Sequence, residues 1–93
     1  MYIVVRTWTN ASAVIDKMLE RQQEVTDLLC GVPGFKAYFA TRSGDTLTSV
    51  TVCDSKLGTD ESTRLAGDWA KTNLSGASVG APQIAEGEAF IHF

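Results

Sequence analysis

Apolar residues follow two different periods along the chain, and the two periods predict different elements. A repeat of two, rich in β-branched and aromatic residues, predicts strands over residues 2–8, 35–41, 47–53 and 84–93. Apolar residues recur at helical spacing from Val14 to Leu29, which predicts a helix after the first strand. A second helix is expected from Thr59 to about Leu74. The predicted element order is therefore β-α-β-β-α-β.

Capping and turn residues mark the expected ends of these elements. Asn10 is interpreted as a capping residue at the start of the first helix, and Gly31 as the residue that ends it. Thr59 is the expected N-cap of the second helix. Residues 43–45, Ser-Gly-Asp, predict a tight hairpin turn between the second and third strands. Gly87 is a candidate bulge in the last strand.

This order predicts a single α+β domain over residues 1–93. Two right-handed crossovers around one hairpin lead to a ferredoxin-like antiparallel sheet with two helices on one face. The chain is short, so folding leaves only a small margin of stability. Cys30 and Cys53 each end an apolar run and are interpreted as buried free thiols rather than as a disulfide.

The sheet has apolar side chains on both of its faces, although two helices can cover only one. A solvated face of an antiparallel sheet should be polar. The face expected to lie away from the helices also holds Arg6 and Arg42. Its mixture of aromatic, apolar and charged side chains predicts a homodimer formed by two sheets packed back to back. The candidate residues of this dimer face are Tyr2, Val4, Trp8, Tyr38, Phe90 and His92.

Charge and composition restrict the class of partner. The formal charge is −3 and the sequence pI is about 4.9, with no stripe of basic residues. We therefore expect neither nucleic acid nor an anionic membrane surface as a partner. No apolar stretch approaches the roughly 18 residues of a membrane span, and the first strand begins directly after Met1 without a signal peptide. The expected location is the cytoplasm.

The sequence contains no strong catalytic motif. His92 is its only histidine, which excludes a site with several histidines in one chain, and no metal is expected. Glu86 and Glu88 share a strand face and could divide acid and base roles, or could be two exposed glutamates. Trp69 and Asn73 lie four residues apart on the second helix. They could orient an apolar ligand that bears oxygen, or could fill the core and cap the helix.

The element order and length resemble the dimeric α/β-barrel superfamily, in particular the antibiotic biosynthesis monooxygenase-like proteins. Local features similar to that group are Pro33-Gly34-Phe35, the hairpin that leads into residues 49–52, and the tryptophan of the second helix. The resemblance implies a barrel of two sheets and a pocket between each sheet and its helices. It also implies a function, since some members oxidise aromatic polyketides without a cofactor, and others degrade haem or act as isomerases.

This chain contains only some of the residues on which these activities depend in the family. Haem-degrading members use an Asn, a Trp and a His; Asn10 and Trp69 match the first two, but residues 71–82 contain no histidine. For cofactor-free oxygenation, Trp69 and Asn73 match the residue types used. We therefore expect no cofactor and a small apolar or aromatic ligand, bound by a monooxygenase or isomerase. The alternative is a non-catalytic binding or interaction protein. The candidate pocket residues are Trp69, Asn73, Asn10, Phe35 and Phe39.

Overall fold

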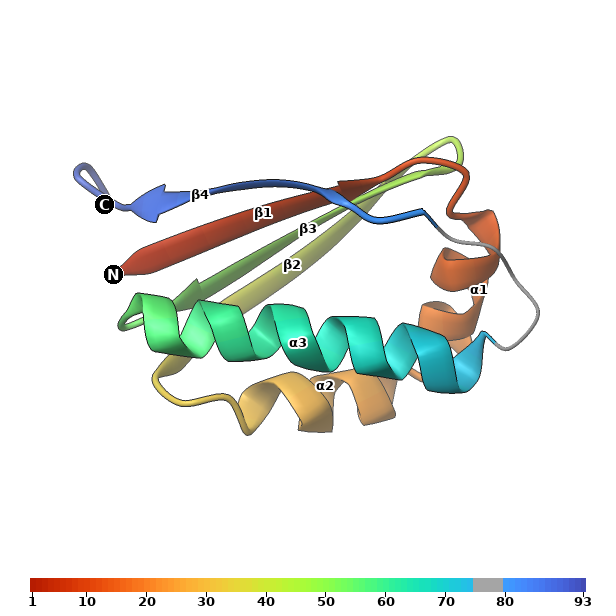
Figure 1. The fold of residues 1–93 in the computed structure, drawn as a ribbon, viewed down its shortest axis with the longest axis horizontal. Coiled ribbons are helices and arrows are strands. Elements are labelled where there is room, and N and C mark those ends of the chain that lie inside the picture. The colour runs from red at the N-terminus through yellow and green to blue at the C-terminus, as the bar shows by residue number, and fades with distance from the viewer. Residues whose placement is uncertain (75–79) are drawn as a thin grey trace.

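The computed structural model describes residues 1–74 and 80–93 (Figure 1). Within them the chain forms strands and helices in the order β1 (Tyr2–Trp8), α1 (Ser12–Glu20), α2 (Gln22–Cys30), β2 (Phe35–Ser43), β3 (Thr46–Cys53), α3 (Lys56–Asn73) and β4 (Gln83–Glu88). The predicted exit loop after the last helix lies partly outside the described residues.

The strands form one antiparallel sheet in the order β2-β3-β1-β4. Figure 1 shows α1, α2 and α3 on the same side of this sheet. The predicted α+β, ferredoxin-like class is therefore confirmed. The β2–β3 hairpin turns where it was predicted to turn, and Gly44 there has a φ of 62°, which suits glycine.

The first predicted helix is in fact two. The backbone of Arg21 leaves the helical region, with φ −124° and ψ 40°, and separates α1 from α2. Each half buries its own apolar residues, Val14 and Ile15 on α1 and Leu29 on α2. After the break α1 packs on β3 and α2 on β2, a tertiary arrangement that the continuous helical spacing of the sequence does not reveal.

The two predicted N-caps are wrong. Ser55 precedes α3, so Thr59 lies inside the helix, where its hydroxyl donates to the Lys56 carbonyl. Ala11 rather than Asn10 precedes α1, and Asn10 has a positive φ of 52°. Gly31 directly follows the last residue of α2, as predicted, although its φ of −81° is not the left-handed conformation of a C′ glycine. The tertiary contacts of each helix, not the best capping side chain nearby, decide where it begins and ends.

The bulge predicted at Gly87 in the last strand is absent there, and β2 contains a bulge instead. The pairing of β4 with β1 runs through Gly87 without a shift, whereas β2 shifts register between Phe35 and Ala37. Beyond β4, Ala89 N–H donates to the Met1 carbonyl, but the predicted strand does not continue to residue 93. Phe90 has 90% of its surface exposed. Residues after Glu88 have no neighbouring strand within the described chain to pair with.

The two faces of the sheet are exchanged relative to the prediction. Val4 and Arg6 are only 2% and 1% exposed, and Arg6 reaches Ser62 and Thr63 of α3. Their face is therefore the one that the helices cover. Tyr2, Trp8 and Tyr38 lie on the same covered face, so they and Val4 are not available to the predicted dimer face. Alternation defines two sets of side chains, but it does not say which set meets the helices.

The outer face of the sheet carries no charged residue among its paired positions. It consists of Ile3, Val5, Thr7, Ala37, Phe39, Thr41, Ser43, Thr46, Thr48, Val50, Val52, Gln83, Ala85 and Gly87. Phe39 is 58% exposed. The paired positions of this face therefore carry no charge, whereas the face that the sequence was expected to present outward holds Arg6 and Arg42.

The cysteines lie in different environments. Cys53 is buried, as predicted, whereas Cys30 at the end of α2 is exposed, which contradicts the prediction for that residue.

Candidate functional site

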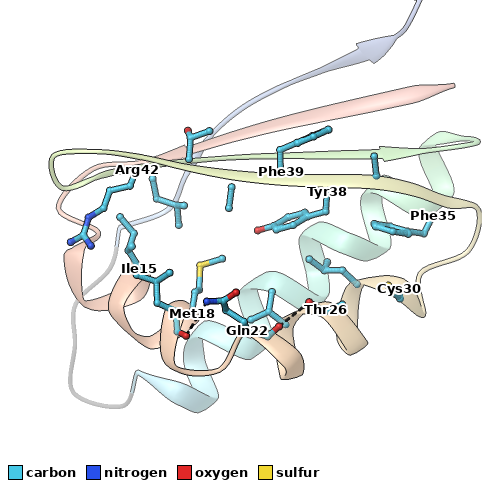
Figure 2. A pocket seen from close by; sticks show the side chains of 16 residues that line it. Ile15, Met18, Gln22, Thr26, Cys30, Phe35, Tyr38, Phe39 and Arg42 are labelled. Carbon is cyan, nitrogen blue, oxygen red and sulfur yellow. Dashed lines mark hydrogen bonds between the residues drawn. The ribbon is translucent and has the colours of Figure 1, made fainter.

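A large cleft lies between the helices α1 and α2 and the edge strand β2. Its volume is about 800 Å³, within the range of small-molecule sites. Figure 2 shows Tyr38 and Met18 reaching into this space from opposite sides. Most of the lining is apolar, and Arg42 is its only charged side chain among the described residues. The lining includes Ile15, Met18, Leu19, Val25, Leu29, Phe35, Tyr38, Ala40 and Leu47.

A smaller chamber of about 50 Å³ continues from the cleft toward α3. The two spaces are adjacent because they share Met18, Val25, Leu29, Tyr38 and Leu47 in their walls. Other residues line the chamber but not the cleft, among them Trp8, Ala66, Trp69 and Ala70. A chamber of this size holds a hydroxyl or a water molecule but not a ring. The cleft can therefore hold an apolar body whose small polar end enters the chamber.

Trp69 lines the chamber, and its indole nitrogen is unusual. Nε1 is buried and has no hydrogen-bond partner within residues 1–74 and 80–93. A buried N–H without an acceptor costs free energy of about 1–3 kcal/mol, so an oxygen atom placed in the chamber would be stabilised by it. Asn73 does not take part. Its Nδ2 donates to the Trp69 carbonyl at 2.9 Å, and it lines neither space.

The other predicted pocket residues differ in whether they line the cleft. Phe35 lines the cleft because the bulge in β2 turns it to the helix side, where it pairs in register with buried Cys53. Phe39 borders the opening, but Figure 2 shows its ring pointing away from the helices. Asn10 lines neither space and is exposed. The structure thus brings Trp69 and Phe35 to the site and leaves Asn10 and Asn73 out.

Arg6 forms a buried polar cluster beside this site. Its Nε donates to Ser49 Oγ at 3.2 Å, and its Nη1 donates to Ser62 Oγ at 3.2 Å and to Thr63 Oγ1 at 2.8 Å. Its Nη2 donates to Thr51 Oγ1. Arg6 therefore joins β1 to β3 and to α3 through hydroxyl groups.

Tyr38 connects this cluster to the cleft. Tyr38 lies opposite Thr51 in the β2–β3 pairing, so it is a neighbour of the Arg6 cluster on the covered face. Burial raises the pKa of Tyr38, and the Arg6 charge and the Ser49 hydroxyl partly offset that rise. Burial likewise lowers the pKa of Arg6, while Tyr38 and Cys53 oppose that change. The phenol therefore stays protonated at neutral pH and can donate a hydrogen bond.

The sequence interpretation missed Arg6 and Tyr38 as residues of the site. One signal was present: an arginine stands in a strand of β-branched residues, and a neighbouring strand contains serine and threonine, among them Ser49 and Thr51. Those hydroxyls are the partners that a buried guanidinium needs.

Glu86 belongs to a separate surface cluster at the other end of β1. Its carboxylate accepts hydrogen bonds from Tyr2 Oη at 3.0 Å and from Lys56 Nζ at 2.6 Å. Both hydrogen bonds lower the pKa of Glu86, and the bond from Lys56 has the larger effect. Glu88 instead lies 3.7 Å from the N-terminal ammonium group. The two glutamates therefore have separate partners, in agreement with the interpretation of exposed strand glutamates.

Two further properties concern the described residues as a whole. Within residues 1–74 and 80–93, no three His, Cys, Asp or Glu side chains lie together as they would to hold a metal ion. No helix in the described part of the chain has the length and apolar character to cross a membrane.

Comparisons with known proteins identify the fold. No protein-family model and no curated protein sequence matches the chain. Among solved structures, the chain is similar to the monooxygenase from the gene ActVA-Orf6 of Streptomyces coelicolor, in complex with nanaomycin D. The TM-score is 0.70 at 16% identity, over 99% of this chain and 89% of that one. NE2512, a protein of unknown function from Nitrosomonas europaea, also scores 0.70 at 16% identity, over 99% and 92% of the two chains.

SnoaB, a cofactor-independent oxygenase from Streptomyces nogalater, has a TM-score of 0.64 at 15% identity, over 98% of this chain and 94% of that one. Identities this low show a common fold. The chain therefore has the fold of the antibiotic biosynthesis monooxygenase-like proteins, and the resemblance predicted from the sequence is confirmed at that level.

Proposed function

We propose that the chain binds an aromatic or polyketide-like small molecule in the cleft and oxidises it with O₂ as a cofactor-independent monooxygenase. The observation that carries this proposal is the cleft itself, about 800 Å³ of mainly apolar space between β2 and the helices α1 and α2. Two solved structures of the same fold, named as a monooxygenase and as a cofactor-independent oxygenase, support it.

The shape of the site supports one orientation of the ligand. The rings lie in the cleft against Phe35 and Leu29, and an oxygen substituent enters the chamber toward Trp69. There the unpartnered indole N–H donates to that oxygen. Burial of a ring system of this size contributes several kcal/mol, at about 25 cal/mol per Å² of apolar area.

The chemistry of such a ligand needs no redox group from the protein. An ionised phenol or enol is electron-rich enough to react with O₂ directly. For anthrone the balanced reaction is anthrone plus O₂ giving anthraquinone plus water: one oxygen atom enters the ring carbon, and the other leaves as water with the two hydrogens of that carbon. The protein would hold the ring, exclude bulk water and stabilise the charge that develops on oxygen.

A non-catalytic binding protein is the second candidate, and one observation favours it. No Asp, Glu or His lines the cleft or the chamber among the described residues, so no ordinary general base is present there. A binding protein would keep the affinity for aromatic ligands but not accelerate their oxidation.

Oxygen uptake with anthrone as the substrate separates the two candidates. The parent should accelerate uptake with anthraquinone as product, and Trp69→Phe should lower kcat by roughly tenfold or more, because one buried donor is lost. Ala40→Trp should block binding, since Ala40 is an exposed residue of β2 that lines the cleft. Asn73→Ala is the matched control on α3 and should leave kcat unchanged. Binding of anthrone without faster oxidation would assign the second function.

We also propose that the protein acts as a homodimer through the outer face of the sheet. A twofold contact sets the same surface patch of each chain against itself, so a charge there would oppose its own copy. The outer positions of β1, β2, β3 and β4 carry no charge, which makes this face compatible with itself. The covered face cannot form the dimer contact, because the helices pack against it.

Sedimentation equilibrium over a range of concentrations tests the dimer. The parent should sediment as a dimer at micromolar concentration, and Phe39→Lys should shift it to monomer by placing a charge on the outer face. Leu57→Lys is the control, since Leu57 is 71% exposed on α3, away from that face. A parent that remains monomeric at high concentration would contradict the proposal.

A further inference from the structure

Arg6 is a buried cation whose partners are all neutral. It is 1% exposed, and no carboxylate pairs with it within residues 1–74 and 80–93. Buried charges in proteins are ordinarily paired with an opposite charge, because hydroxyl dipoles only partly replace hydration. The site therefore holds one positive charge that nothing in the described chain neutralises.

The two hydroxyl groups that α3 contributes around Arg6 are oriented to accept hydrogen bonds from the guanidinium rather than to donate to it. Ser62 Oγ donates its own hydrogen to the Thr59 carbonyl at 2.7 Å, and Thr63 Oγ1 donates to the same carbonyl at 3.2 Å. Their lone pairs are thereby directed to the guanidinium. The arrangement holds Arg6 in its charged form and in one place.

The surroundings of Tyr38 favour a negative ligand. Tyr38 lines both the cleft and the chamber and is a neighbour of Arg6 on the covered face. The other titratable side chains of the described walls are Arg42 and Cys30, both in the cleft, and α3 contributes none to the chamber. Behind the wall, Cys53 on β3 is buried with its pKa raised by burial, so it stays neutral. Arg42 pairs with Asp16 at 3.3 Å, so the unpaired positive charge beside Tyr38 is that of Arg6.

We propose that Tyr38 and Arg6 form an oxyanion site, so that the ligand binds as its ionised phenol or enol. The Tyr38 hydroxyl donates to the ligand oxygen, and the fixed charge of Arg6 behind it stabilises the negative charge. Arg6 lines neither space, so it acts through Tyr38 as a positioning and electrostatic residue. This inference rests on the proposed function, because it requires a ligand in the cleft.

The proposal defines the ligand class and a proton balance. The ligand must carry an acidic hydroxyl on an aromatic or enolic carbon, and binding breaks only its O–H bond. The neutral ligand and the protein give the protein–anion complex and one proton, which is released to solvent. No protein base is needed, which agrees with the absence of acidic side chains and histidine from the described walls. The bound anion is also the form that transfers an electron to O₂ most readily.

A chromogenic pair of probes tests this without any measurement of oxygenation. 4-Nitro-1-naphthol changes its absorption spectrum when it ionises, and its methyl ether, 1-methoxy-4-nitronaphthalene, cannot ionise. At a pH about one unit below the pKa of the phenol in water, roughly a tenth of it is ionised when free. We expect about half to nine-tenths of the bound phenol to be ionised, with its apparent pKa lowered by about one to two units, since a charge-assisted hydrogen bond is worth about tenfold to a hundredfold.

Substitutions assign the effect to the two residues. Tyr38→Phe should return the bound probe to its pKa in water and lower its affinity about tenfold to a hundredfold, while the affinity of the ether stays unchanged. Tyr2→Phe is the matched control, because Tyr2 bonds to Glu86 on the surface. Arg6→Gln should also lose the spectral shift, and Arg6→Lys, which keeps the charge, should recover part of it. Circular dichroism checks that each Arg6 variant folds.

The outcomes separate this inference from the proposed function. If phenol and ether both bind the parent, but the bound phenol ionises as it does in water, the oxyanion site is wrong and the cleft as a binding site stands. The oxyanion site is equally wrong if Tyr38→Phe leaves the spectral shift intact. If neither probe binds, or Ala40→Trp does not reduce their binding, both proposals are overturned.

Discussion

Gly58 offers a sharp test of how α3 is held against the sheet. A Cβ atom added at Gly58 would lie 2.2 Å from the Pro33 carbonyl oxygen, 2.9 Å from Cys53 Cβ and 3.0 Å from Cys53 Sγ. The nearest of these is a backbone atom, which cannot rotate away. The first turn of α3 must therefore approach the loop before β2 this closely, and it thereby places the following turns, with Ser62 and Thr63, over Arg6.

The expected magnitude follows from two opposing terms. Replacing glycine by alanine inside a helix ordinarily stabilises it by up to about 1 kcal/mol. Overpacking a tight contact costs about 1–3 kcal/mol or more, and a contact of this kind belongs at the upper end. We expect Gly58→Ala to destabilise the protein by about 2 kcal/mol, which corresponds to a fall in Tm of roughly 8–16 °C for a domain of this size.

Gly67→Ala is the matched control in the same helix. A Cβ atom at Gly67 would meet nothing within 4 Å, so only the helix propensity acts there. Its Tm should rise by roughly 4–8 °C, for a gain of about 1 kcal/mol. Thermal unfolding followed by circular dichroism measures both variants. A Gly58→Ala variant as stable as the parent, or a change in Tm of the same sign for both substitutions, would show that α3 does not pack this tightly at Gly58.

Two further predictions concern titration and thiol reactivity. The pKa of Glu86 lies below its ordinary value of 4.5 because Lys56 donates a hydrogen bond to the carboxylate, so its contribution to stability is present above that value and is lost as the pH falls through the lowered pKa. Glu86→Gln should therefore reduce the decrease in Tm between about pH 6 and pH 3, whereas an unchanged slope would contradict the pairing. Cys30 is exposed and Cys53 is buried with a raised pKa, so Ellman's reagent should label one thiol rapidly in the folded protein and the second only after unfolding; equal rates for the two thiols would disprove the burial of Cys53.

The site could be predicted from the sequence only in part. Trp69 was identified because a large side chain among small ones at helical spacing indicates space beside it, and it does line the chamber. Asn73 shares its helical spacing, but its amide bonds to the Trp69 carbonyl instead. Spacing along a helix selects a face, whereas the competition between a ligand and the helix's own carbonyls is decided by local geometry.

Two-residue alternation alone could not identify the pocket side of β2. Phe35 and Phe39 share a face in an unbroken strand, and the shift after Phe35 places them on opposite faces. A bulge changes which face every earlier residue of the strand meets, and nothing in residues 35–37 marks it in the sequence. Tyr38 follows the bulge and reaches the cleft for another reason, because its face of the sheet is the one that the helices cover.

By itself the sequence determined the order of the strands and of the helical segments between them, the hairpin at Gly44 and the apolar character of both sheet faces, since these follow from local periodicity and turn chemistry. Only the tertiary structure decided which face the helices cover, because right-handed crossovers and the packing of α3 choose between two sets of side chains that alternation leaves equivalent. That choice placed Arg6 inside, among the hydroxyls of β3 and α3, and left the uncharged face outside. The apolar sheet still favours a partner, now through Ile3, Val5 and Phe39 on the opposite face from the one expected.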